Sequence, residues 1–148
     1  MSLELSINND IKAAMKAKDK QALNALRAVK SAILLAKTEK GSSDVSEDTE
    51  LKILQRLVKQ RKESAELYQK QGRNDLAEDE LFQLKIIQKY LPEQMDEKSV
   101  RKEIEAVIAE SGASSMKDMG RVMGITTKKL AGKADNKLIS TIVKELLS

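Results

Sequence analysis

The chain has 148 residues, of which 41% are hydrophobic, which is enough for one ordinary domain or two small ones. It contains no cysteine and no histidine. Disulfides, thiolate nucleophiles, imidazole acid–base catalysis and the usual zinc sites are therefore excluded. Aromatic residues make up only 2% of the chain, so stacking of bases or cofactors on aromatic rings is almost unavailable.

The sequence also lacks the usual signs of a membrane or secreted protein. No segment approaches the roughly 20 consecutive apolar residues that span a bilayer, and the N-terminus lacks the apolar run of a signal peptide. We therefore expect no membrane partner and a cytoplasmic location, which the absence of cysteine fits. Neighbouring carboxylates at Glu78, Asp79 and Glu80 point in different directions on a helix, so we expect no metal and no cofactor.

Apolar residues recur with a helical period in four segments before the only proline, Pro92. The expected N-terminal caps of these four helices are, in chain order, Ser2, Asp19, Ser46 and Asn74. The second helix is expected to end at Lys40, before a loop of glycine, serine and aspartate over residues 41–48. Only a short break at Gly72 separates the third and fourth helices, so they are predicted to form a long antiparallel hairpin.

After Pro92 the pattern predicts three shorter helices, at about 96–111, 115–130 and 135–148. Each has apolar residues on one face, which is typical of a small three-helix bundle. No segment shows the alternation of a strand. The sequence therefore predicts an all-α protein, with an N-terminal four-helix domain at 1–91 and a C-terminal three-helix domain at 96–148.

Glycine and positive charge are concentrated in the last third of the chain. Four of the six glycines lie between Gly112 and Gly132, and residues 111–148 carry seven Lys or Arg against three Asp or Glu. The cations of interest are Arg121, Lys128, Lys129, Lys133 and Lys137. Gly132 and Lys133 directly precede the helix that Asp135 opens, and backbone N–H groups at a helix start beside cations favour phosphate. The alternative is that these lysines only keep a small bundle soluble.

Two glycines, Gly120 and Gly124, are predicted inside one helix, four residues apart. Each costs a helix about 1 kcal/mol relative to alanine. We expect close packing against a neighbouring helix to be the reason, in preference to direct contact with RNA or a partner. Ser114, Ser115 and Lys117 invite comparison with Ser-Ser-Lys amidases, but these serines stand where a helix cap is expected, so no catalytic residue is predicted.

Three segments of the second half are similar to one known family: residues 90–95 (YLPEQM), 112–124 (GASSMKDMGRVMG) and 132–135 (GKAD). With the length and the helical plan, they resemble the stand-alone YqeY proteins of the GatB/YqeY family across essentially the whole chain. The C-terminal part is also similar to the tail domain of the B subunit of the tRNA-dependent Asp/Glu amidotransferase. That tail is a three-helix bundle that helps to hold the tRNA.

This resemblance implies a non-catalytic, tRNA-binding helical module. Its expected RNA contacts are Arg121, Lys128, Lys129, Gly132, Lys133 and Lys137. The family label mentions a glutamine-dependent carbon–nitrogen ligase, but the catalytic domain of the amidotransferase has no counterpart in these 148 residues. The alternative is a protein-interaction module that docks a partner subunit through the long hairpin or through a face of Met116, Met119 and Met123.

Overall fold

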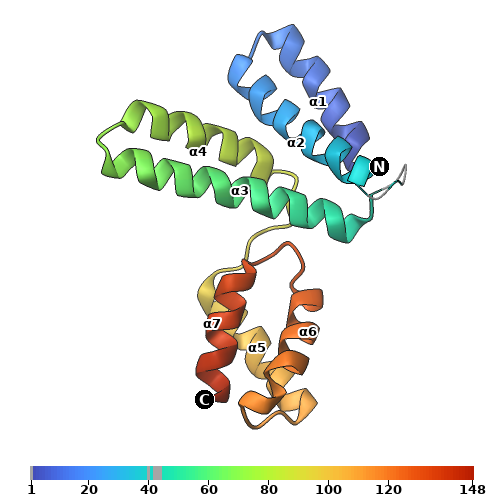
Figure 1. Ribbon diagram of the computed structural model, residues 1–148, viewed down its shortest axis with the longest axis vertical. Helices are drawn as coiled ribbons and strands as arrows, with labels where there is room; N and C mark the ends of the chain where they lie inside the picture. Colours follow the sequence, from blue (N-terminus) through green and yellow to red (C-terminus); the bar gives the residue numbers. More distant parts are fainter. Residues whose placement is uncertain (1, 40, 42–44) are drawn as a thin grey trace. The chain divides into compact units, whose positions relative to one another are not determined.

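The computed structural model describes residues 2–39, 41 and 45–148, and in that range it contains seven α-helices, one 3₁₀ helix and no strand (Figure 1). The all-α prediction is therefore confirmed. The helices are α1 (Leu3–Ala17), α2 (Lys20–Glu39), α3 (Glu47–Lys70), α4 (Asn74–Gln88), α5 (Glu97–Ser111), η1 (Met116–Asp118), α6 (Met119–Lys129) and α7 (Asn136–Leu147). The predicted helix end at Lys40 and the centre of the predicted 41–48 loop lie outside the described residues.

The chain divides into two compact units, Met1–Leu91 and Pro92–Ser148. In the first unit α1 pairs with α2, and α3 with α4 forms the long hairpin that the sequence predicts (Figure 1). Helix α2 packs against both helices of the hairpin. The core of this unit is aliphatic, and its most deeply buried large side chains are Ile7, Val29, Leu54 and Ile87.

Polar side chains begin three of these helices as predicted. The hydroxyl of Ser2 accepts a hydrogen bond from the N–H of Leu5, and Ser46 caps α3 in the same way. Asp19 accepts from the first turn of α2. The prediction for Asn74 is wrong, because Asn74 is the first helical residue and the preceding arginine makes no side-chain cap.

Two polar contacts join distant parts of the first unit. The Tyr90 hydroxyl, after the end of α4, donates a hydrogen bond to Asp10 of α1. Burial, together with this hydrogen bond, raises the pKa of Tyr90. Lys37 near the end of α2 pairs with Glu4 near the start of α1. These contacts hold α1 against α2 and against the end of the hairpin.

The second unit is the predicted bundle of three α-helices, α5, α6 and α7, each in contact with the other two. Asp96 and Asp135 cap α5 and α7 by accepting backbone N–H groups. The predicted helix at 115–130 is broken near its start, where the 3₁₀ turn η1 precedes α6. The core consists of branched aliphatic side chains with at most 1% exposure: Val100, Ile104, Val122, Ile139, Ile142 and Val143.

Thr126 is the one buried polar residue in the described part of the chain, and its hydroxyl has no hydrogen-bond partner there. A buried hydroxyl without a partner opposes folding by its desolvation free energy. We expect Thr126→Val to raise the free energy of unfolding by about 1 kcal/mol. Thermal unfolding followed by circular dichroism measures this change. Thr126→Ser is the matched control: it keeps the hydroxyl, removes the methyl group and should destabilise. A Val variant less stable than the Ser variant would contradict the expectation.

Candidate nucleic-acid interface

The rotation of α6 about its own axis decides which of its residues can meet a ligand. Val122, Thr126 and Leu130 are buried, with exposed fractions of 0 to 3%, and they lie along one side of the helix. A helix turns by about 100° per residue, so a position two residues from Val122 points to nearly the opposite side. Gly120 and Gly124 both stand at that spacing, and both are exposed.

The prediction that Gly120 and Gly124 pack against a neighbouring helix is wrong. A Cβ atom added at either glycine would meet nothing within 4 Å. The physical reason is the rotation just described, because the apolar side of α6 is turned to the core. The same spacing from Val122 is visible in the sequence and could have indicated an outward position. The backbone of α6 is therefore uncovered on the outer side at these two glycines.

Two cations lie on the same side of α6 as this bare backbone. Arg121 and Lys128 are seven residues apart, which is two helical turns or about 10 Å along the axis. Both are exposed, and Gly124 lies between them in the sequence. The exposed side chain of Ile125 lies beside this row. We call the surface made by Gly120, Arg121, Gly124, Ile125 and Lys128 the outer face of α6.

Two of the predicted site cations have carboxylate partners. The Arg121 guanidinium lies 3.2 Å from Asp118, and Lys129 Nζ lies 3.0 Å from Glu103 of α5. The Asp118 carboxylate also accepts the N–H of Ser114, and this hydrogen bond, with Arg121 nearby, lowers its pKa. The bond to Glu103 raises the pKa of Lys129. The positive charges of Arg121 and Lys129 are thus partly compensated within the unit.

The other three predicted cations, Lys128, Lys133 and Lys137, are exposed and make no ion pair with any described carboxylate. They lie within ten residues of one another, in the last turn of α6, in the connecting turn and in the first turn of α7. Lys128 suits the negative end of its helix, whereas Lys137 stands at the positive end of α7, where a cation is unfavourable. Helix stability therefore does not account for Lys137.

The start of α7 does not offer the phosphate site that the sequence suggests. The Asp135 carboxylate accepts the N–H of Lys137 at 3.1 Å, so it occupies the helix start and adds a negative charge there. Gly132 is buried, with a φ of 74°, and its carbonyl accepts a hydrogen bond from Gln94 at 2.7 Å. Gly132 therefore shapes the turn between α6 and α7, because a left-handed backbone favours glycine.

The methionine face proposed as a docking surface is largely turned inward. Met119 and Met123 pack against the core of the second unit, and only Met116, with 45% exposure, remains open. Since two of its three members already have apolar neighbours, this set does not form a continuous apolar surface.

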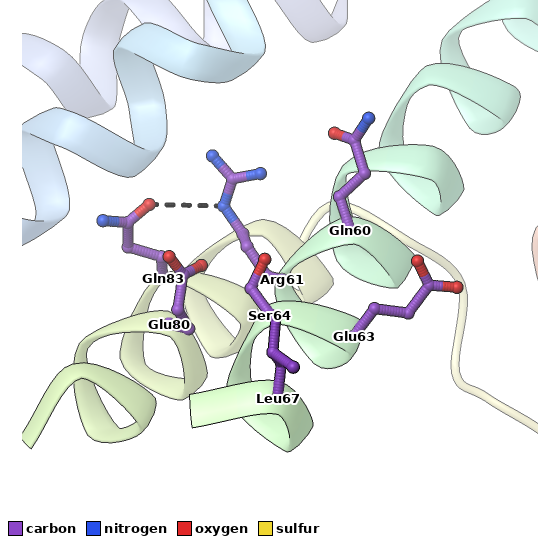
Figure 2. A pocket seen from close by; sticks show the side chains of 7 residues that line it. All are labelled: Gln60, Arg61, Glu63, Ser64, Leu67, Glu80 and Gln83. Carbon is purple, nitrogen blue, oxygen red and sulfur yellow. Dashed lines mark hydrogen bonds between the residues drawn. The ribbon is translucent and has the colours of Figure 1, made fainter. Parts of the chain in front are cut away.

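The hairpin of the first unit contains a hollow of about 530 Å³ between α3 and α4 (Figure 2). Its lining residues are Gln60, Arg61, Glu63, Ser64, Leu67, Glu80 and Gln83. Arg61 Nε donates to Gln83 Oε1 at 3.2 Å, and a second guanidinium N–H donates to the Leu57 carbonyl. The one cation of the hollow is thus hydrogen-bonded within the hairpin, beside two carboxylates, which does not favour an anionic ligand.

In the described residues, no three side chains of a kind that binds metal ions come together. No helix in that part of the chain is both long and apolar enough to cross a membrane.

The fold and the outer face of α6 define a two-unit, all-α protein with exposed cations on α6, on the turn that follows it and at the start of α7. The model of the family described as Yqey-like protein matches residues 4–147, and the chain belongs to this family. A relative from Vanderwaltozyma polyspora, altered inheritance of mitochondria protein 41, mitochondrial, is 31% identical over 146 residues, covering 94% of this chain and 78% of the relative. The protein of the same name from Pyrenophora tritici-repentis is 29% identical over 142 residues, covering 93% and 77%.

Because the space around the two glycines of α6 is open, replacing them with alanine should stabilise the fold. Gly124→Ala should raise the free energy of unfolding by about 0.5–1 kcal/mol, because alanine favours the helix and the new methyl group meets no neighbour. Gly120→Ala, in the first turn, should have a smaller effect of the same sign. Urea unfolding measures both. The control is Gly112→Ala, which should destabilise because Gly112 has a φ of 71°. A destabilising Gly124→Ala would show that the outer face is covered.

Proposed function

We propose that this YqeY-family chain is a non-catalytic tRNA-binding module that contacts RNA through its second unit. One observation carries the proposal: Lys128, Lys133 and Lys137 are exposed without a described carboxylate partner, beside a helix face with uncovered backbone. Cations of this kind bind phosphates by releasing counterions from the nucleic acid. The bare backbone lets a sugar–phosphate chain approach α6 more closely than side chains would allow.

Arg121 and Lys129 have a secondary part in this proposal. Each already has a carboxylate partner, so part of the electrostatic gain from a phosphate is offset by loss of the existing pair. No aromatic residue follows Tyr90, so bases cannot stack on rings of the second unit. Recognition should therefore depend on the RNA backbone and its shape, with little preference for one tRNA.

The resemblance to the GatB/YqeY family brings a glutamine-dependent carbon–nitrogen ligase to mind, but we do not propose that activity for this chain acting alone. Transfer of an amide nitrogen requires an activated nucleophile and a base held close together. The chain has no cysteine or histidine, and Ser114 and Ser115 lie at the start of η1, where Ser114 donates its backbone N–H to Asp118. A role in holding RNA for a separate catalytic subunit agrees better with this arrangement.

Docking of a protein partner is the competing function. It receives less support, because Met119 and Met123 pack inward and the hollow of the hairpin is polar. The two functions differ in their response to salt, since contacts with phosphates weaken steeply as salt rises and apolar docking does not.

Replacement of the three unpaired lysines tests the RNA proposal. We expect the triple variant Lys128→Ala, Lys133→Ala, Lys137→Ala to bind fluorescently labelled bulk tRNA at least about tenfold more weakly at 0.1 M salt. A plot of log K against log salt has a negative slope, and its magnitude should decrease by about two to three, one unit per lost phosphate contact. Fluorescence anisotropy at several salt concentrations measures both quantities.

The matched control for the triple variant removes the same charge from the first unit. Lys16, Lys70 and Lys85 stand in the last turns of α1, α3 and α4 and are exposed. Their combined replacement by alanine lowers the net charge equally, yet should leave the salt slope nearly unchanged. Equal losses in the two triple variants would mean that overall charge drives binding, and the proposed site would fail.

A larger side chain on the outer face of α6 separates close backbone approach from charge alone. Gly124→Leu should keep or increase stability but weaken tRNA binding by about fivefold or more, because the side chain would hold the RNA away from the helix. Anisotropy titration of the folded variant measures the loss. Ala109→Leu, at an exposed position on α5, is the control and should bind as the parent does. If Gly124→Leu binds tRNA as the parent does, the outer face of α6 is not part of the interface.

A further inference from the structure

Gln94 lies in the irregular segment before α5, and its side-chain amide joins this segment to the turn after α6. Both hydrogen bonds come from Nε2, one to the Pro92 carbonyl at 2.9 Å and one to the Gly132 carbonyl at 2.7 Å. A primary amide has two N–H donors, so this pair of acceptors uses both. The turn between α6 and α7 and the start of α5 lie at the same end of the unit (Figure 1).

The main chain of Lys133 is held on both sides within the same turn. Its N–H donates to the Leu130 carbonyl at 2.9 Å, and its carbonyl accepts the N–H of Met95 at 2.9 Å. Leu130 and Ala134, on either side of the turn, are buried with exposed fractions of 3% and 4%. The Lys133 side chain nevertheless remains exposed. Lys133 is therefore a solvent-facing cation on a fixed backbone.

A fixed backbone matters for binding because ordering a flexible loop opposes association. A cation on a mobile turn loses main-chain freedom when it contacts a phosphate, whereas a cation on a fixed turn has lost that freedom during folding. Gln94 is an exposed residue in a segment that has no regular helix to define its position. Its bond to the Pro92 carbonyl is exposed, whereas its bond to the carbonyl of the buried Gly132 is part-buried. Loss of the second bond should therefore also lower the stability of the turn, so the test must separate positioning from stability.

We propose that Gln94 is a positioning residue for RNA binding, which acts by holding the Gly132–Lys133 turn so that Lys133 meets a phosphate. This inference rests on the proposed function. It gives a role to the segment at residues 90–95, which contains none of the proposed cationic RNA contacts. Gln94 itself need not touch RNA. Its hydrogen bond to the Gly132 carbonyl fixes the main chain next to Lys133, which makes the contact.

The test is a double-mutant cycle measured with fluorescently labelled bulk tRNA. Gln94→Met keeps the length and neutrality of the side chain and removes both donors. We expect it to weaken binding about three- to tenfold. In a Lys133→Ala background the same change should have almost no further effect, because the residue that it positions is absent. In a Lys128→Ala background its full effect should persist. Gln88→Met, at an exposed glutamine of α4, is the control and should bind normally.

The cycle separates positioning from a purely structural role. If Gln94 only stabilises the fold, its loss should lower affinity equally in the Lys133→Ala and Lys128→Ala backgrounds, and the inference is overturned. Unchanged binding of Gln94→Met in the parent background overturns it as well. In both cases Lys133→Ala alone still weakens binding if the proposed function holds. If neither Lys128→Ala nor Lys133→Ala changes the affinity, it is the proposed function that fails.

Discussion

Burial of one side of α6 is the constraint on which the character of the second unit depends. Val122 and Leu130 belong to the core with residues of α5 and α7, and Thr126 is buried on the same side of α6. This burial fixes the rotation of α6 about its axis. Once these three residues are buried, Gly120 and Gly124 can only face outward. The core thus determines the surface: the requirement for apolar burial places bare backbone and two cations where a ligand can reach them.

The charges of this unit divide into two groups with different physical roles. Pairs such as Lys129 with Glu103 and Arg101 with Glu145 join neighbouring helices at the surface, where such pairs contribute little free energy each. The unpaired cations have no such contact to maintain. Lys137 even opposes the dipole of its own helix. A protein that needed charge only for solubility would have little reason to place a lysine there.

Local rules predicted much of the fold, because the interactions that begin a helix lie within four residues. Ser2, Asp19 and Ser46 are predicted correctly as caps for this reason. The site was harder to predict, because its geometry depends on contacts between distant segments. The hydrogen bond from Gln94 to the turn 38 residues away follows from three-dimensional placement. No periodicity marks an irregular segment such as 92–95.

The placement of the aromatic residues has a consequence for spectroscopy. Tyr68, Phe82 and Tyr90 all belong to the first unit, and the chain has no tryptophan. Intrinsic fluorescence and near-ultraviolet circular dichroism therefore report on the first unit alone. The second unit is optically silent at these wavelengths, so a single tryptophan introduced there would give a signal free of protein background when excited at 295 nm or longer. The second unit is thus naturally suited to site-specific optical labelling.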